Sequence, residues 1–181
     1  HAGGTVAGGS EAARQGRASR DKGRGYDAKI SVRRSMERGA TKGRTPMDVT
    51  TVKGEYTVVP RNQIRRFSCV SDRDEYRDLA QEPSATAVWY MRPRPGLDTG
   101  SREAFELVQF TVDGIDRPIR RATRTGGQVY TVNIGRDVVD DEQPVTISYT
   151  YRTLSPKHGH LLHFDLEQPT RGVDFELDYS E

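Results

Sequence analysis

The sequence predicts a mainly β protein, an antiparallel β-sandwich or partly open barrel of about seven or eight strands. The clearest sign is the alternation of apolar and polar residues over 145–152 and again over 173–180. A period of two is typical of a strand with one buried and one solvated face. Antiparallel sheets can leave one face in water, so strands of this kind favour an antiparallel fold.

The first 25 residues are rich in Gly, Ala, Ser and Arg and nearly free of large apolar side chains. Such a segment cannot bury enough surface to offset the entropy lost on ordering, so we expect a flexible tail at 1–25. A short basic helix and a linker are expected next, at 26–47, and the antiparallel β domain follows at 48–181.

The helix is expected within 27–38. Asp27 can accept hydrogen bonds as its N-cap, and Gly39 fits the position after its last turn. Apolar residues recur at every fourth position, as on one face of a helix. These residues are Ala28, Val32 and Met36.

Turn residues divide the β domain. Asp113-Gly114 predicts a tight turn after one strand, and Gly126-Gly127 predicts a hairpin. The candidate strands are 49–59 with an interruption at Gly54, 63–70, 86–92, 105–112, 117–124, 128–134, 145–152, 161–167 and 173–179. The segments between them are predicted as one or two helical turns at 72–80, a proline-containing loop at 92–96 and an acidic connection at 136–143.

Charge is distributed unevenly along the chain. Residues 1–53 contain 12 Lys and Arg against 5 Asp and Glu, whereas residues 54–181 contain 16 against 21. A basic N-terminal arm on an acidic body can bind nucleic acid, an anionic surface or the body itself. The arm residues proposed to bind a partner are Arg33, Arg34, Arg38, Lys42 and Arg44.

The last two predicted strands, 161–167 and 173–179, would form a hairpin whose solvated faces are acidic. Either register sets carboxylates opposite carboxylates, which destabilises a sheet unless they are screened or compensated. Arg152 is the nearest basic residue by predicted topology, and compensation could also come from the arm, another domain or a cation. This acidic face is a second proposed partner surface: Asp165, Glu167, Asp174, Glu176 and Asp178.

Three histidines lie close together at 158, 160 and 163, followed by Asp165. Imidazole and carboxylate groups are common metal ligands, so a metal-binding domain or metal-dependent enzyme that uses His158–Asp165 is an alternative hypothesis. His160 and His163 would face opposite sides of a strand, and Pro156 and Gly159 favour a turn. We therefore expect exposed loop histidines and no metal ligand or cofactor.

The densest basic segment of the body is 117–124. It lacks the aromatic residues on which bases stack, so we interpret it as a charged edge strand that resists aggregation rather than as a phosphate-binding surface. The single cysteine, Cys69, lies in a predicted strand and is expected to be a small buried apolar residue rather than a nucleophile.

No catalytic or nucleotide-binding motif is evident, and no apolar run is long enough to cross a membrane. The chain begins at His1 and ends just after a strand pattern, and arginine outnumbers lysine 23 to 5. The sequence therefore favours a non-catalytic interaction or regulatory module of a larger, bacterial-type cytoplasmic protein. It would bind a protein partner or neighbouring domain through charged sheet faces. An alternative hypothesis, based on the charge of the N-terminal arm, is that the protein binds nucleic acid through residues 1–53.

Overall fold

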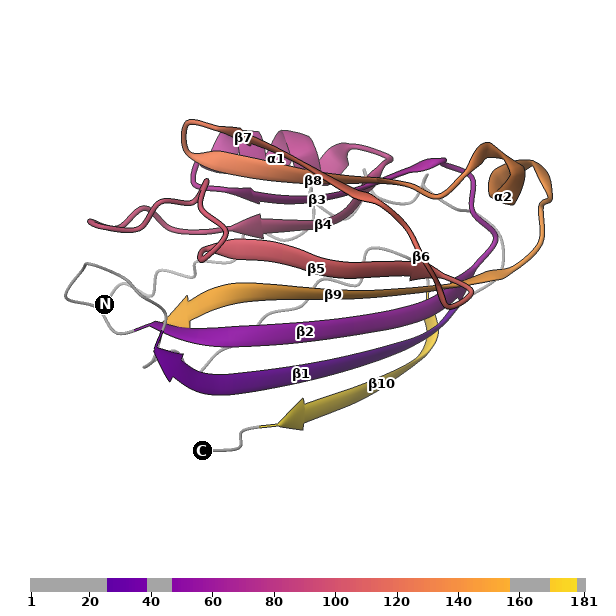
Figure 1. The fold of residues 1–181 in the computed structure, drawn as a ribbon, viewed down its shortest axis with the longest axis horizontal. Coiled ribbons are helices and arrows are strands. Elements are labelled where there is room, and N and C mark those ends of the chain that lie inside the picture. Colours follow the sequence, from indigo (N-terminus) through magenta and orange to yellow (C-terminus); the bar gives the residue numbers. More distant parts are fainter. Residues whose placement is uncertain (1–25, 39–46, 157–169, 179–181) are drawn as a thin grey trace, which may run out of the picture.

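The computed structural model describes residues 26–38, 47–156 and 170–178, which form two β-sheets and two short helices (Figure 1). The larger sheet contains, in spatial order, β10 (Thr170–Asp178), β1 (Tyr26–Arg38), β2 (Met47–Val58), β9 (Val145–Pro156), β5 (Phe105–Val112) and β6 (Ile115–Asp116). The smaller sheet contains β4 (Ala85–Tyr90), β3 (Ile64–Val70), β8 (Gly127–Asn133) and β7 (Ile119–Arg124). The helices are α1 (Arg73–Gln81) and α2 (Arg136–Asp140).

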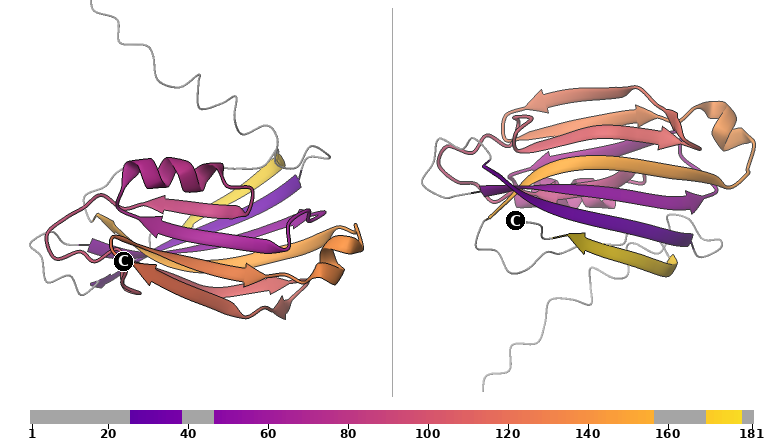
Figure 2. Two further views of the ribbon diagram at one scale, coloured as in Figure 1. Left: turned by 90° about the horizontal axis from the view of Figure 1, so that it is seen from above. Right: turned by 60° about the horizontal axis from the view of Figure 1, so that its bottom comes forward.

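The mainly β prediction is confirmed, and most neighbouring strands are antiparallel. Two pairs are parallel, β3 with β4 and β1 with β10. The first pair has a local cause, because α1 connects its strands as a crossover helix (Figure 2). Among the described residues no helix has the length and hydropathy that a membrane crossing requires.

Local signals place several elements correctly. β5 covers the predicted 105–112, and Asp113 and Gly114 both have positive φ in the tight turn that leads to β6. α1 begins after Asp72, whose carboxylate accepts hydrogen bonds from the backbone N–H groups of Asp74 and Glu75 at 2.9 and 2.8 Å. These carboxylate contacts satisfy amides that a helix leaves unbonded at its start.

The helix predicted over 27–38 is wrong, because this segment is strand β1. Ala28, Ile30 and Val32 stand at alternate positions, so the same residues fit a period of two as well as a spacing of four. Pairing with neighbours decides between the two readings: β1 pairs with β2 from Ala28 to Arg38 and with β10 from Tyr26 to Arg33. Tertiary context often overrides weak helix propensity in this way.

The interruption expected at Gly54 is also absent, since β2 runs continuously through it. Gly54 pairs with Tyr149 of β9, and a Cβ atom on Gly54 would clash with the tyrosine ring. The aromatic ring therefore covers the glycine, and this ring replaces the side-chain packing that glycine lacks.

The core lies between the two sheets. Phe67 of the smaller sheet packs edge-to-face on Phe110 and Tyr149 of the larger, with ring centroids 6.0 and 5.1 Å apart. Edge-to-face contacts add to the free energy gained from burial. Figure 1 shows that β10 lies at the edge of the larger sheet away from the smaller one, so it lies outside this doubly covered region.

Candidate partner-binding site

The structure places part of the predicted arm next to part of the predicted acidic face. Asp174, Glu176 and Asp178 lie in β10, and Arg33 lies in the adjacent β1. Arg33 Nε is 3.2 Å from Asp178 Oδ2, and both side chains are exposed. The backbones of Arg34 and Arg38 also belong to β1. The other proposed partner-binding residues lie outside the described residues: Lys42, Arg44, Asp165 and Glu167.

The register explains how the β10 carboxylates are accommodated. Lys29 stands across from Asp174 and Arg33 across from Asp178, whereas Glu176 faces the neutral Ser31. The predicted hairpin partner, 161–167, lies outside the described residues. Opposite charges at cross-strand positions stabilise a sheet modestly, and an exposed ion pair contributes at most about 1 kcal/mol.

The expectation that Arg152 compensates these carboxylates is wrong. Arg152 lies in β9, where it pairs with Thr51 of β2 and Glu106 of β5. Two strands, β1 and β2, separate it from β10. From sequence order, the strand that contains Arg152 was expected to lie next to the last strands of the chain. In the described part of the sheet, β1 and β2 lie between β9 and β10 instead.

The opposite face of β10 carries an unexpected apolar surface. Val173, Phe175 and Leu177 are 40%, 49% and 38% exposed, although alternation predicts a buried face for these positions. They are three of the five large apolar side chains found exposed among the described residues; the others are Val108 and Ile115. We call Val173, Phe175 and Leu177 the β10 apolar row. A continuous exposed row of this kind marks an interaction site more often than scattered single residues do.

β10 is also an edge strand within the described part of the chain, where its only paired neighbour is β1. The far edge of such a strand presents backbone N–H and C=O groups that can pair with another strand. β10 therefore combines three recognition elements: an edge, an apolar row and a row of three carboxylates. Sequence reasoning found the carboxylates and the alternation but could not show that the apolar side chains stay exposed.

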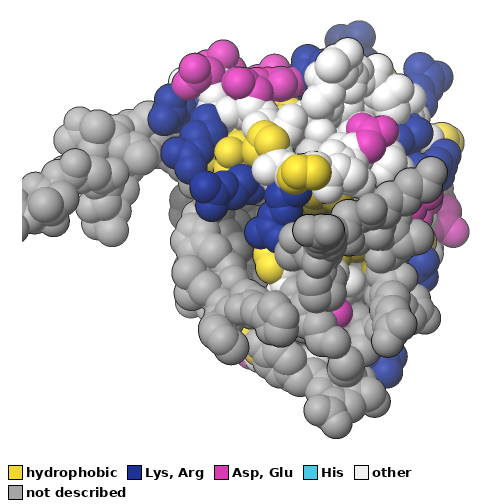
Figure 3. Space-filling view, turned by 90° about the vertical axis from the view of Figure 1, so that its left-hand side faces the viewer, with side chains coloured by type: hydrophobic (Ala, Val, Ile, Leu, Met, Phe, Trp, Pro, Cys, Tyr) yellow, Lys and Arg dark blue, Asp and Glu magenta, His cyan; other side chains and the backbone are white. Residues whose placement is uncertain are grey.

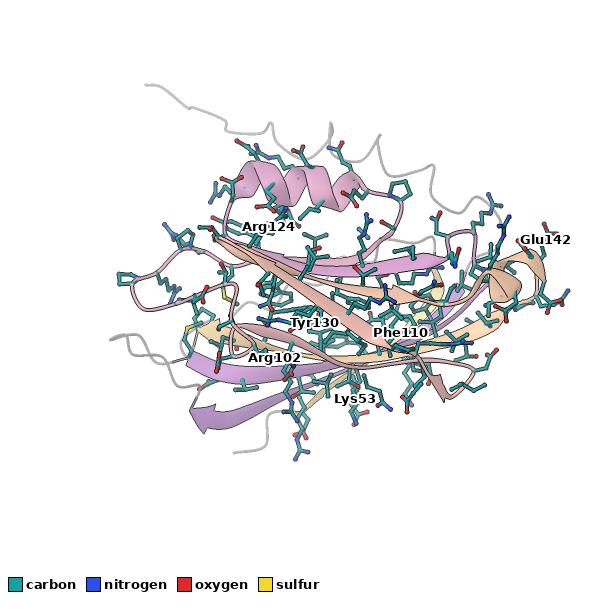
Figure 4. The ribbon with its side chains drawn as sticks, turned by 45° about the horizontal axis from the view of Figure 1, so that its top comes forward. Lys53, Arg102, Phe110, Arg124, Tyr130 and Glu142 are labelled. Carbon is teal, nitrogen blue, oxygen red and sulfur yellow. The ribbon has the colours of Figure 1, made fainter. Side chains whose placement is uncertain are left out.

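A polar groove of about 420 Å³ crosses the outer face of the larger sheet from β10 to β5. Lys53 projects into solvent on this face, opposite the interior where Tyr130 and Phe110 lie (Figure 4). Two lysines and two glutamates line the groove, and Ser148 donates a 2.9 Å hydrogen bond to Glu55. The groove adjoins the carboxylate row of β10 and is lined by Lys29, Ser31, Lys53, Gly54, Glu55, Gln109, Thr111, Ser148, Tyr149, Thr150 and Glu176.

Residues 119–124 of the basic segment form β7, an edge strand of the smaller sheet, as interpreted from sequence. Arg120, Ala122 and Arg124 are exposed on one of its faces. Arg121 points the other way: its Nε donates to Gln128 Oε1 at 2.9 Å, and its guanidinium carbon lies 6.0 Å from the Tyr130 ring centre. Arg121 is therefore a packing residue, whereas Arg120 presents charge at the edge.

One end of the molecule gathers basic side chains around a few apolar ones, with acidic side chains along the upper rim (Figure 3). The loop between β4 and β5 runs along this end and carries Arg92, which is exposed, and Arg94, which is half-buried. Carboxylates pair with several arginines of α1, β7 and this loop: Arg77 with Asp74, Arg102 with Glu106, and Arg124 with Glu75. This end therefore carries mixed charge rather than a continuous phosphate-binding surface.

The remaining candidate chemistry lies elsewhere. Cys69 is fully buried in β3, and burial raises the pKa of its thiol to about 12. The thiolate is thus strongly disfavoured, as expected of a core cysteine. The histidine window 158–163 and Asp165 lie outside the described residues, and within those residues no cluster of metal-ligating side chains occurs.

Comparison with known proteins adds no identification. No protein-family model matches the chain, and no curated protein or solved structure is detectably similar to it.

Proposed function

We propose that this chain is a non-catalytic interaction module that binds an extended segment of a partner protein along β10. The segment adds a strand to the larger sheet, a recognition mode that uses backbone hydrogen bonds for affinity and alternate side chains for specificity. The observation that carries the proposal is the exposed β10 apolar row on an edge strand.

Energetics favour an occupant that covers the apolar row. Full burial of a Val, Leu or Phe side chain contributes about 1.5–3 kcal/mol, so covering the half-exposed row contributes on the order of 2–4 kcal/mol. Association loses translational and rotational freedom at a cost of about 4 kcal/mol or more. Backbone hydrogen bonds and charge pairs must supply the difference, which favours a strand over a flat apolar surface.

Charge specifies the partner segment. An added strand alternates its side chains between the two faces of the sheet. One set meets the β10 apolar row, and the other meets Asp174, Glu176 and Asp178. The segment that fits therefore carries basic residues on the face of the carboxylates, and on the other face side chains that can cover apolar surface.

The test uses fluorescein-labelled synthetic peptides and the full chain. Fluorescence anisotropy should detect binding of an alternating Val-Lys peptide, and binding should weaken as salt rises. An alternating Val-Glu peptide should not bind. A peptide with the same Val and Lys content in two separate blocks should bind at least tenfold more weakly, because its side chains cannot divide between the two faces.

Two variants locate the binding to β10. Phe175→Ser and the double variant Asp174→Lys with Glu176→Lys should each raise the Kd at least tenfold. Val108→Ser is the matched control, because Val108 is similarly exposed on β5 (43%), and it should leave the Kd unchanged. Equal binding of the alternating and block peptides, or equal losses in Phe175→Ser and Val108→Ser, would contradict the proposal.

A further inference from the structure

We infer that the strand which docks on β10 is β7 of a second copy of this chain. The inference rests on the proposed function and names its partner. β10 and β7 are edge strands of different sheets, and within the described residues each pairs with one neighbour, β1 and β8 respectively. Their exposed charges are opposite in sign.

The two charge rows have matching spacing. β10 carries Asp174, Glu176 and Asp178 on one face, and β7 carries Arg120 and Arg124 on its exposed face. An antiparallel alignment that sets Arg120 opposite Asp178 also sets Arg124 opposite Asp174. Opposite charges then meet at two positions, where each carboxylate lies between a base of β1 and a base of β7, and Ala122 faces Glu176. Each pair contributes modestly to the sheet. Arg124 also pairs with Glu75 of its own chain, so Arg120 is the stronger attractive group.

The apolar face is matched by the same alignment. β7 turns Arg121 and Thr123 to the face opposite Arg120. These positions meet Leu177 and Phe175 of the second copy. Arg121 is held against Gln128 and Tyr130 of its own chain, so the methyl group of Thr123 supplies the apolar cover, over Phe175. The inner faces of the two sheets then become continuous across the junction.

Pairing of β10 with β10, or of β7 with β7, is electrostatically unfavourable. Two β10 strands side by side would set carboxylates against carboxylates, and two β7 strands would set arginines against arginines, which is unfavourable at cross-strand positions. Only the unlike edges attract. Figure 1 shows β7 and β10 on opposite sides of the molecule, so one partner copy cannot pair with both edges at once. The contact is therefore heterologous and repeats head to tail into rings or open chains rather than closing as a twofold dimer.

Sedimentation velocity on the full chain tests the inference. Wild-type protein should associate as its concentration rises and dissociate at high salt. The β7 variant (Arg120→Glu with Ala122→Glu) and the β10 variant (Asp174→Lys with Glu176→Lys) should each remain monomeric. A 1:1 mixture of wild-type protein with the β10 variant should form shorter assemblies, because the variant accepts no further copy on its altered edge.

The control for the β7 variant is Arg92→Glu with Pro93→Glu, which makes the same charge change as that variant but on two exposed loop residues. It should associate like wild type, and circular dichroism should show all variants folded. Wild type that stays monomeric at every concentration, or association that survives both edge variants, would overturn the inference. Binding of the Val-Lys peptide would still support the proposed function in that case, so the two failures are distinguishable.

Discussion

Two side chains of β3 face the core with opposite chemical properties. Cys69 is neutral, because burial raises its pKa, and it packs like a small apolar residue. Arg65 is 5% exposed, and its Nε and Nη2 atoms have no hydrogen-bond partner among the residues that the structure describes. Burying a guanidinium group without a full set of hydrogen-bond partners costs free energy.

Replacing Arg65 with methionine should therefore stabilise the protein. The substitution keeps much of the side-chain volume and removes a buried charge whose desolvation is not repaid, so we expect the free energy of unfolding to rise by about 1–4 kcal/mol. Urea denaturation followed by circular dichroism measures the change. Arg61→Met, at an exposed position, is the control. A loss of more than about 1 kcal/mol in Arg65→Met would show that the guanidinium is bonded in solution.

At the level of single elements, β2 depends on the contact between Gly54 and Tyr149. The Tyr149 ring also lies 5.1 Å from that of Phe67 and 6.2 Å from that of Tyr151, measured between centroids. The ring is thus held from several sides and cannot swing away at little cost. Glycine in the middle of a strand is usually weakening, but here it makes room for an aromatic side chain.

Gly54→Ala should destabilise the protein by about 1–3 kcal/mol, because overpacking forces neighbouring side chains out of favoured rotamers. The double variant Gly54→Ala with Tyr149→Val should lose less than the sum of the two single variants, as measured in a double-mutant cycle by urea denaturation. Additive losses would mean that the alanine methyl group does not meet the tyrosine ring.

At the scale of the whole molecule, the division into a basic arm and an acidic body that the charge distribution suggested does not match the fold. β1 lies between β2 and β10, so residues 26–38 are part of the larger sheet. Arg33 then contributes its charge to the body through Asp178. Removing the first 53 residues would delete β1 together with Met47 and Val52, which are buried in the core.

Truncation at two points tests this arrangement. A chain that starts at residue 26 keeps every described strand and should melt cooperatively, with a Tm close to that of the full chain. A chain that starts at residue 54 should lose its cooperative thermal transition, because β10 loses its neighbour β1 and β9 loses more than half of its neighbour β2. Thermal melting followed by circular dichroism distinguishes the two. Equal cooperativity in both chains would show that β1 is dispensable for folding.

The local part of this fold could be predicted from sequence. Alternation located β5, β8 and β9, and short-range chemistry located the Asp113-Gly114 turn and the start of α1. These features depend on residues within a few positions of each other. The identity of β1, its parallel pairing with β10 and the exposure of the β10 apolar row depend on strands more than a hundred residues apart. Ala28, Ile30 and Val32 suit a helix or a strand, and only the neighbours available for hydrogen bonding decide between them. Exposure is decided in the same way, because alternation shows that one face is apolar, whereas the packing of distant elements determines whether anything covers it.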